Sequence, residues 1–179
     1  MKSPLLAAVL LATTAHSALA GGVAFRFGDE SFGASIAGDI GPETSAQFDW
    51  LHHEDDADLL SAGLYANGRR GALTGRVGAK AVTLTADDSG FDGGVMAFGG
   101  DLSLPLNDVL RLRGGIYYGP EATGFSDVDG YSEWSLSAEI SIFQNSAIQL
   151  GFGDIEFDAE KGGEFDFEDG PFVRLQLRL

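Results

Sequence analysis

The sequence predicts an all-β fold: a transmembrane antiparallel up-and-down β-barrel of ten strands, with eight strands as the alternative. Three observations support this fold class. The chain begins with an export signal, most of the remainder alternates apolar and polar residues, and short connections alternate with longer acidic ones. With 179 residues, the chain is long enough for one domain and too short for two well-cored ones.

The first twenty residues have the pattern of a secretory signal peptide. Lys2 supplies the positive charge, residues 5–12 are a short apolar run, and Ala18-Leu19-Ala20 has the small-x-small pattern of a cleavage site. The run is too short for a membrane-spanning helix, and no later apolar run approaches the roughly 20 residues that such a helix needs. We therefore expect residues 1–20 to be removed and residues 21–179 to form the barrel.

The clearest strand lies at residues 132–143. Trp134, Leu136 and Ile140 fall on one face, whereas Glu133 and Glu139 fall on the other. A helix would mix these two sets around its circumference, and a strand separates them. The same alternation predicts, in order, strands at 22–28, 31–39, 44–53, 58–68, 72–86, 93–104, 109–119, 131–143, 147–158 and 170–179.

Two of these segments alternate less regularly. In 72–86, Val82 and Leu84 share one face, but Leu73 and Val77 lie on the other. Segment 147–158 changes its apolar face near Gly151–Asp154, which indicates a β-bulge at that point.

The negative charge is concentrated between the strands. Of a net charge of −16, most comes from segments 53–58, 87–93, 119–130 and 158–170, which contain sixteen acidic residues and one lysine. Segments 40–43, 67–71, 105–108 and 144–146 are short turns. Because outer-membrane barrels have long extracellular loops and short periplasmic turns, the acidic segments are expected at the extracellular rim. No basic stripe is present, so nucleic acid is not an expected partner.

The polar face of the predicted strands carries charges of both signs. A soluble β-sandwich or lipocalin-like barrel is the alternative fold, but its dry core would not tolerate them, whereas the lumen of a membrane barrel would. We expect these charges to pair across the lumen and largely fill it: Arg111 and Arg113 with Asp101 and Glu133 or Glu139, and Arg174 and Arg178 with Glu139 or with Asp49.

The signal peptide, the rhythm of short turns and long loops, and the terminal strand 170–179 together resemble the YfaZ-like family of Gram-negative outer-membrane proteins. The resemblance covers the whole mature chain and rests on pattern rather than on a diagnostic motif. It implies a small outer-membrane barrel, surrounded by lipid and lipopolysaccharide and assembled by the barrel-insertion machinery, with no catalytic residues to carry over. The chain departs from typical terminal strands by ending in Leu179 rather than an aromatic residue.

The only histidines after the signal peptide, His52 and His53, precede Glu54, Asp55 and Asp56. A histidine oriented by a carboxylate could serve a barrel-embedded hydrolase of lipid A or peptide. Neighbouring strand residues point to opposite faces, however, so at most one histidine could join a given site. No serine motif accompanies them. A solvated strand end is the favoured interpretation, and no catalytic residue is assigned.

Neither a metal nor a cofactor is predicted. The acidic, glycine-containing segments 87–93 and 127–130 lack the ligand spacing of an EF-hand, and the absence of cysteine excludes thiolate zinc sites. Aromatic residues at the predicted strand ends are interpreted as interfacial girdles. They are Trp50, Tyr117, Tyr118, Tyr131 and Trp134. The predicted function is therefore a structural or narrow-pore barrel, with the hydrolase or a soluble periplasmic binding barrel as alternatives.

Overall fold

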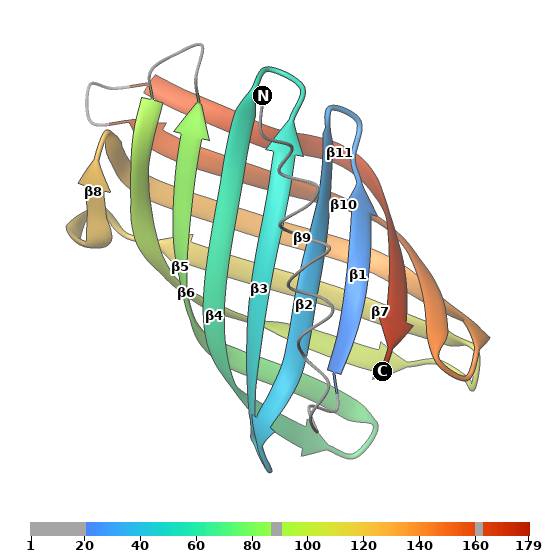
Figure 1. The fold of residues 1–179 in the computed structure, drawn as a ribbon. Helices are drawn as coiled ribbons and strands as arrows, with labels where there is room; N and C mark the ends of the chain where they lie inside the picture. The colour runs from blue at the N-terminus through green and yellow to red at the C-terminus, as the bar shows by residue number, and fades with distance from the viewer. Residues whose placement is uncertain (1–20, 87–90, 160–162) are drawn as a thin grey trace.

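The computed structural model describes residues 21–86, 91–159 and 163–179, which form a closed antiparallel β-barrel (Figure 1). The predicted signal peptide, and residues 87–90 of one acidic segment, lie outside the described residues. Among the described residues the single helix is the short 3₁₀ turn Glu121–Thr123, and no helix is long and apolar enough to cross a membrane.

Ten long strands make the wall of the barrel, as the alternation predicts. In chain order they are β1 (Gly21–Phe27), β2 (Ser31–Gly41), β3 (Thr44–His53), β4 (Ala57–Arg70), β5 (Leu73–Ala86), β6 (Phe91–Pro105), β7 (Leu110–Gly119), β9 (Val128–Phe143), β10 (Ser146–Ala159) and β11 (Gly163–Arg178). The remaining strand, β8 (Gly124–Ser126), is a three-residue strand paired only with the start of β6.

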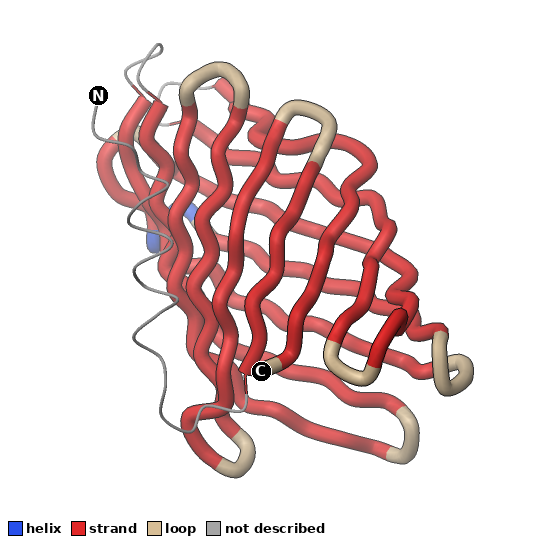
Figure 2. The backbone as a smooth tube through the Cα atoms, turned by 45° about the vertical axis from the view of Figure 1, so that its right-hand side comes forward, coloured by secondary structure: helices blue, strands red, loops and turns tan. Residues whose placement is uncertain are grey.

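Each long strand pairs with its neighbours along the chain, and the wall closes where β1 pairs with β11. The connection containing β8 is bypassed, because β7 pairs directly with β9. The connections gather at two opposite ends of the barrel (Figure 2). We call the end with connections 28–30, 54–56 and 120–127 the acidic rim. The end with 42–43, 71–72, 106–109 and 144–145, where Gly21 and Leu179 also lie, is the turn rim.

The last hairpin is longer than the sequence indicates. The acidic segment 158–170 is predicted as a loop, yet the β10–β11 ladder continues up to the pair Ala159 and Gly163. Phe167 explains the extension, because its side chain is fully buried inside the barrel and fixes the strand there. Acidic side chains alternate with such residues, so the composition indicates a loop where the structure has a strand.

The outer surface of the wall is apolar. Leu136, Ile116 and Phe98 point outward, with 60%, 68% and 52% of their surface exposed. They belong to adjacent strands, since β7 lies between β6 and β9. A continuous exposed apolar band of this extent is unstable in water and is typical of a surface that contacts lipid.

The interior has two layers. Towards the acidic rim it is filled by an apolar cluster, which comprises Leu51, Ala57, Leu59, Tyr65, Val82, Leu84, Ala86, Val95, Ala97, Tyr117, Val128, Tyr131, Ile155, Phe157 and Phe167. Towards the turn rim the inward side chains are mostly charged or polar.

This layering explains both irregular segments. Val82 and Leu84 face inward into the apolar cluster, whereas Val77 faces outward. Ile155 and Phe157 likewise point inward. The bulge predicted near Gly151–Asp154 is wrong, because the ladder between β9 and β10 runs without interruption from Ala147 to Asp158. The register shift on the β11 side lies at Ile155 and Glu156. The apolar face changes because the interior becomes apolar.

Candidate functional site

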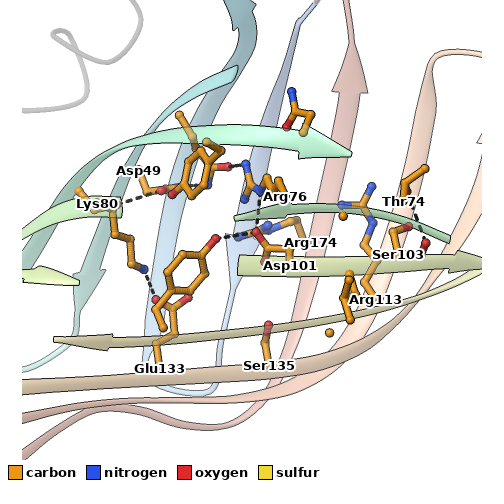
Figure 3. A pocket seen from close by; sticks show the side chains of 18 of the residues that line it. Asp49, Thr74, Arg76, Lys80, Asp101, Ser103, Arg113, Glu133, Ser135 and Arg174 are labelled. Carbon is orange, nitrogen blue, oxygen red and sulfur yellow. Dashed lines mark hydrogen bonds and ion pairs between the residues drawn. The ribbon is translucent and has the colours of Figure 1, made fainter. Parts of the chain in front are cut away.

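The charged half of the interior surrounds a cavity of about 610 Å³, which we call the chamber (Figure 3). Its mouth is at the turn rim, where Pro42, Asn67 and Thr74 line it. Its inner end is formed by Leu51 and Ile155 of the apolar cluster. A polar cavity of this size can hold water or a small solute.

Glu139 of β9 gathers three of the four arginines predicted to face the lumen. Its side chain is fully buried, and its oxygens lie 2.9 Å from Arg111 Nη1 and 3.0 Å from Arg178 Nη2. Arg113 Nε lies 2.6 Å from Glu139 Oε2, but its N–H is not directed at that oxygen, so this contact is an ion pair without a hydrogen bond. The three arginines come from β7 and β11, on either side of Glu139 in the barrel.

Asp101 of β6 has different partners from those expected. Its Oδ2 lies 2.5 Å from Arg76 Nε of β5 and accepts a hydrogen bond from the Tyr117 hydroxyl at 2.6 Å. Arg76 also donates to Gln47 at 2.6 Å, and its guanidinium stacks 4.2 Å above the Tyr65 ring. Asp101 is therefore held by a cation and a phenol from its two neighbouring strands.

Glu133 of β9 pairs with Lys80 of β5 across the interior, and it also accepts a hydrogen bond from the Tyr131 hydroxyl. Lys80 Nζ lies 3.0 Å from that same hydroxyl and 4.4 Å from the centre of the Tyr117 ring. The pair lies where the charged layer meets the apolar cluster, and the two tyrosines shield it from solvent.

Arg174 of β11 differs from the other lumen arginines. Its side chain forms no ion pair or hydrogen bond with any of the described residues, and its Nε is solvent-inaccessible. Asp49, one of its expected partners, instead accepts hydrogen bonds from Gln47 at 2.6 Å and from Ser61 at 2.9 Å. Asp49 thus attracts Arg174 across the chamber without contacting it.

Sequence reasoning missed four interior charges: Arg26, Arg76, Lys80 and Glu168. Arg26 of β1 pairs with Glu168 of β11, and its guanidinium lies 3.8 Å above the Phe172 ring. Arg76 and Lys80 have the same parity as Val82 and Leu84 in β5. This shared parity could have indicated that Arg76 and Lys80 point inward. It is hard to recognise in the sequence because the inward residues of β5 change from charged to apolar along the strand.

The two histidines point to opposite faces, as adjacent strand residues must. His52 Nδ1 lies 3.1 Å from Asp58 on the outside, where its ring stacks with Trp50. His53 faces inward and is only 5% exposed, with Nε2 lying 3.4 Å from Glu30 and its ring packed against Phe167. The interpretation of both as a solvated strand end is therefore wrong for His53, whose neighbours indicate a packing role.

The aromatic girdle is also only partly correct. Trp134 and Tyr118 are exposed on the outer wall, and Trp50 is half-buried beside Phe32. Tyr117 and Tyr131 instead point inward and are almost fully buried, with their hydroxyls on Asp101 and Glu133. Inside a barrel a tyrosine can pack its ring in an apolar layer while its hydroxyl reaches a charged one.

One group of carboxylates in the described residues is close enough to hold a metal ion. Glu156, Asp158 and Glu164 have ligand oxygens within 4.8 Å of one another at the acidic end of the β10–β11 hairpin. They are mostly exposed, and exposed acidic groups often lie this close without an ion. No metal role is assigned to them.

This chain is similar to known proteins in sequence and, more weakly, in structure. Outer membrane protein YfaZ of Escherichia coli (strain K12) is 30% identical over 148 residues, which are 82% of this chain and 76% of that protein. The translocator domain of autotransporter NalP from Neisseria meningitidis is a similar solved structure, with a TM-score of 0.45, 13% identity and coverage of 96% of this chain and 93% of that one.

The outer membrane channel DcaP of Acinetobacter baumannii is also similar, with a TM-score of 0.46 and 10% identity over 87% of this chain. The similar region is 54% of that channel, so this chain spans about half its length. A family described as YfaZ precursor matches residues 1–179. The chain therefore belongs to the YfaZ family, and it is an outer-membrane β-barrel protein.

Proposed function

We propose that the protein is a structural outer-membrane barrel with at most a narrow pore. The observation that carries this proposal is the apolar cluster. Several of its side chains are fully buried inside the barrel, so solvent does not reach them. They include Val82, Val95, Phe157 and Phe167. A hydrated ion cannot pass through a packed apolar layer without losing its water, which is energetically costly.

The charged layer narrows the path further. Glu139 with its three arginines, Asp101 with Arg76, and Glu133 with Lys80 join neighbouring and opposite strands across the lumen. Pairing of this kind offsets part of the cost of removing these charges from bulk water. The chamber is then a blind cavity open at the turn rim rather than part of a channel.

In the membrane, the proposal places lipid acyl chains against the apolar wall and lipopolysaccharide around the acidic rim, with the turn rim in the periplasm. The family resemblance further implies assembly by the barrel-insertion machinery. The support for the orientation is the distribution of connections, because short turns are typical of the periplasmic side.

Planar-bilayer recording of the refolded protein tests the proposed function. We expect no steady channels of porin size. The variant Phe167→Ala removes a large side chain from the apolar cluster and should give small, measurable conductance events. Leu136→Ala, a comparable truncation on the outer wall, serves as the matched control and should leave the recording silent. Both variants must first show the heat-dependent gel shift of a folded barrel. Large steady channels in the unmodified protein would overturn the proposal.

A further inference from the structure

The position of Arg174 in the barrel is unfavourable for a cation. It is the direct cross-strand partner of Arg26, and both side chains point into the lumen. Like charges directly opposite each other in a sheet repel. Arg26 is neutralised by Glu168, whereas Arg174 has no carboxylate at ion-pair distance among the described residues. Arg113 adds further repulsion.

Apart from the exposed Asp39 and Glu43 at the mouth, the acidic groups that line the chamber are already engaged. Asp101 is held by Arg76 and Tyr117, and Glu133 by Lys80 and Tyr131. Asp49 accepts hydrogen bonds on both of its oxygens. The chamber lining and the residues paired with it contain eight cations and seven carboxylates. The cations are Arg26, Arg69, Arg76, Lys80, Arg111, Arg113, Arg174 and Arg178, and the carboxylates are Asp39, Glu43, Asp49, Asp101, Glu133, Glu139 and Glu168. The interior of this strongly acidic protein thus has a small excess of positive charge.

We propose that the chamber binds a small soluble oxyanion, a carboxylate or a phosphate, at Arg174. A guanidinium presents a planar set of donors that matches the oxygens of both groups, and its partly desolvated setting strengthens the interaction. The chamber of about 610 Å³ is large enough for such a solute and opens at the turn rim. The anion supplies the counter-charge that the chain itself does not provide.

Thermal unfolding of the detergent-refolded barrel, combined with isothermal titration calorimetry, tests the proposal. Inorganic phosphate and citrate are the probes, each compared with sodium chloride at the same ionic strength. We expect at least one probe to raise the melting temperature and to bind with measurable heat. Arg174→Gln should weaken that binding at least tenfold, because the lost contact is a charge-assisted hydrogen bond. Arg70→Gln, which removes an exposed arginine outside the chamber, should bind as the unmodified protein does.

The melting temperature without probe separates a binding role from a structural one. If Arg174 is an uncompensated cation that awaits a ligand, Arg174→Gln should melt at the same or a higher temperature than the unmodified protein in chloride. A lower melting temperature in chloride, with unchanged binding of the probes, would overturn the proposal. So would equal stabilisation by chloride, phosphate and citrate. Preference for one probe supports it and identifies the oxyanion as carboxylate or phosphate. These outcomes do not depend on whether the barrel conducts.

Discussion

At the residue scale, Glu139 has the greatest consequence for the interior. Its carboxylate is fully buried, and Arg111, Arg113 and Arg178 converge on it from two other strands. Removing one partner of a buried ion pair leaves the others uncompensated, which costs far more than the net value of the pair itself. This one position therefore joins β7, β9 and β11.

We predict that Glu139→Gln lowers the free energy of unfolding by about 2 kcal/mol. The usual loss for a fully buried pair is larger, but the three guanidinium groups are each about a third exposed, so water screens part of it. Urea unfolding of the protein in lipid vesicles measures the change. Asp108→Asn, at an exposed turn position, removes the same charge and should be neutral. Equal stability of the two variants would show that the arginine cluster does not depend on Glu139.

The sequence could predict the inward direction of Glu139 and its arginines, because β7, β9 and β11 alternate cleanly. The individual partners could not be predicted. Asp101 contacts Arg76 rather than Arg111 or Arg113, since β5 is its other neighbour in the sheet and the charges of β5 were not recognised as inward. Arg174 stays unpaired because Asp49, although inward, lies beyond ion-pair distance and is engaged by Gln47 and Ser61.

At the scale of elements, a strand of this barrel separates two environments that differ along its length. The outer face is apolar across the middle of the wall and carries acidic side chains such as Asp154 and Glu156 nearer the acidic rim. The inner face is charged near the turn rim and mainly apolar near the acidic rim. Strand period alone therefore identifies each strand but not which face of β5 or β10 points inward. The same reasoning explains Tyr117 and Tyr131, whose places near strand ends indicated the lipid interface and whose side chains instead close the chamber.

Substitutions on the two faces of β9 should separate lipid contact from lumen contact. We predict that Leu136→Arg lowers the free energy of unfolding by about 2–4 kcal/mol, because it moves a charge into the acyl region. Ser135→Arg, one position away on the face that lines the chamber, should cost clearly less, since it reaches water and lies near Asp101. Unfolding in lipid vesicles again gives the comparison.

Equal losses at Leu136 and Ser135 would indicate that both faces of β9 are packed against protein. That result would contradict the assignment of the exposed apolar wall to lipid.

At the scale of the whole molecule, the barrel has two chemically different ends. The absence of cysteine makes their orientation simple to measure, because each introduced cysteine is unique. We predict that Asp55→Cys at the acidic rim reacts with a membrane-impermeant maleimide on intact cells. Asn107→Cys at the turn rim should react only after the outer membrane is permeabilised. Both positions are exposed on the barrel, so access is limited only by the membrane.

Labelling of Asn107→Cys on intact cells would reverse the proposed orientation and place the mouth of the chamber at the cell surface. If neither cysteine reacts before permeabilisation, the experiment is repeated on cells with truncated lipopolysaccharide. Full-length lipopolysaccharide can shield a surface residue such as Asp55→Cys, so its truncation should allow that cysteine to react while a periplasmic cysteine stays unlabelled.

The seam between β1 and β11 has a further consequence for how the barrel forms. It joins Gly22 to Arg178, residues at opposite ends of the folded chain, and the backbone N–H of Leu179 donates to the carbonyl of Gly21 at 2.8 Å. Closing so long a loop costs conformational entropy, and the β1–β11 contacts that offset this cost form only when the last strand pairs. Before that pairing, the backbone N–H and C=O groups of two unpaired sheet edges would face hydrocarbon, where no water can form hydrogen bonds with them. The wall must therefore be completed in a concerted way, and a chain lacking either end strand has no stable intermediate form in the bilayer.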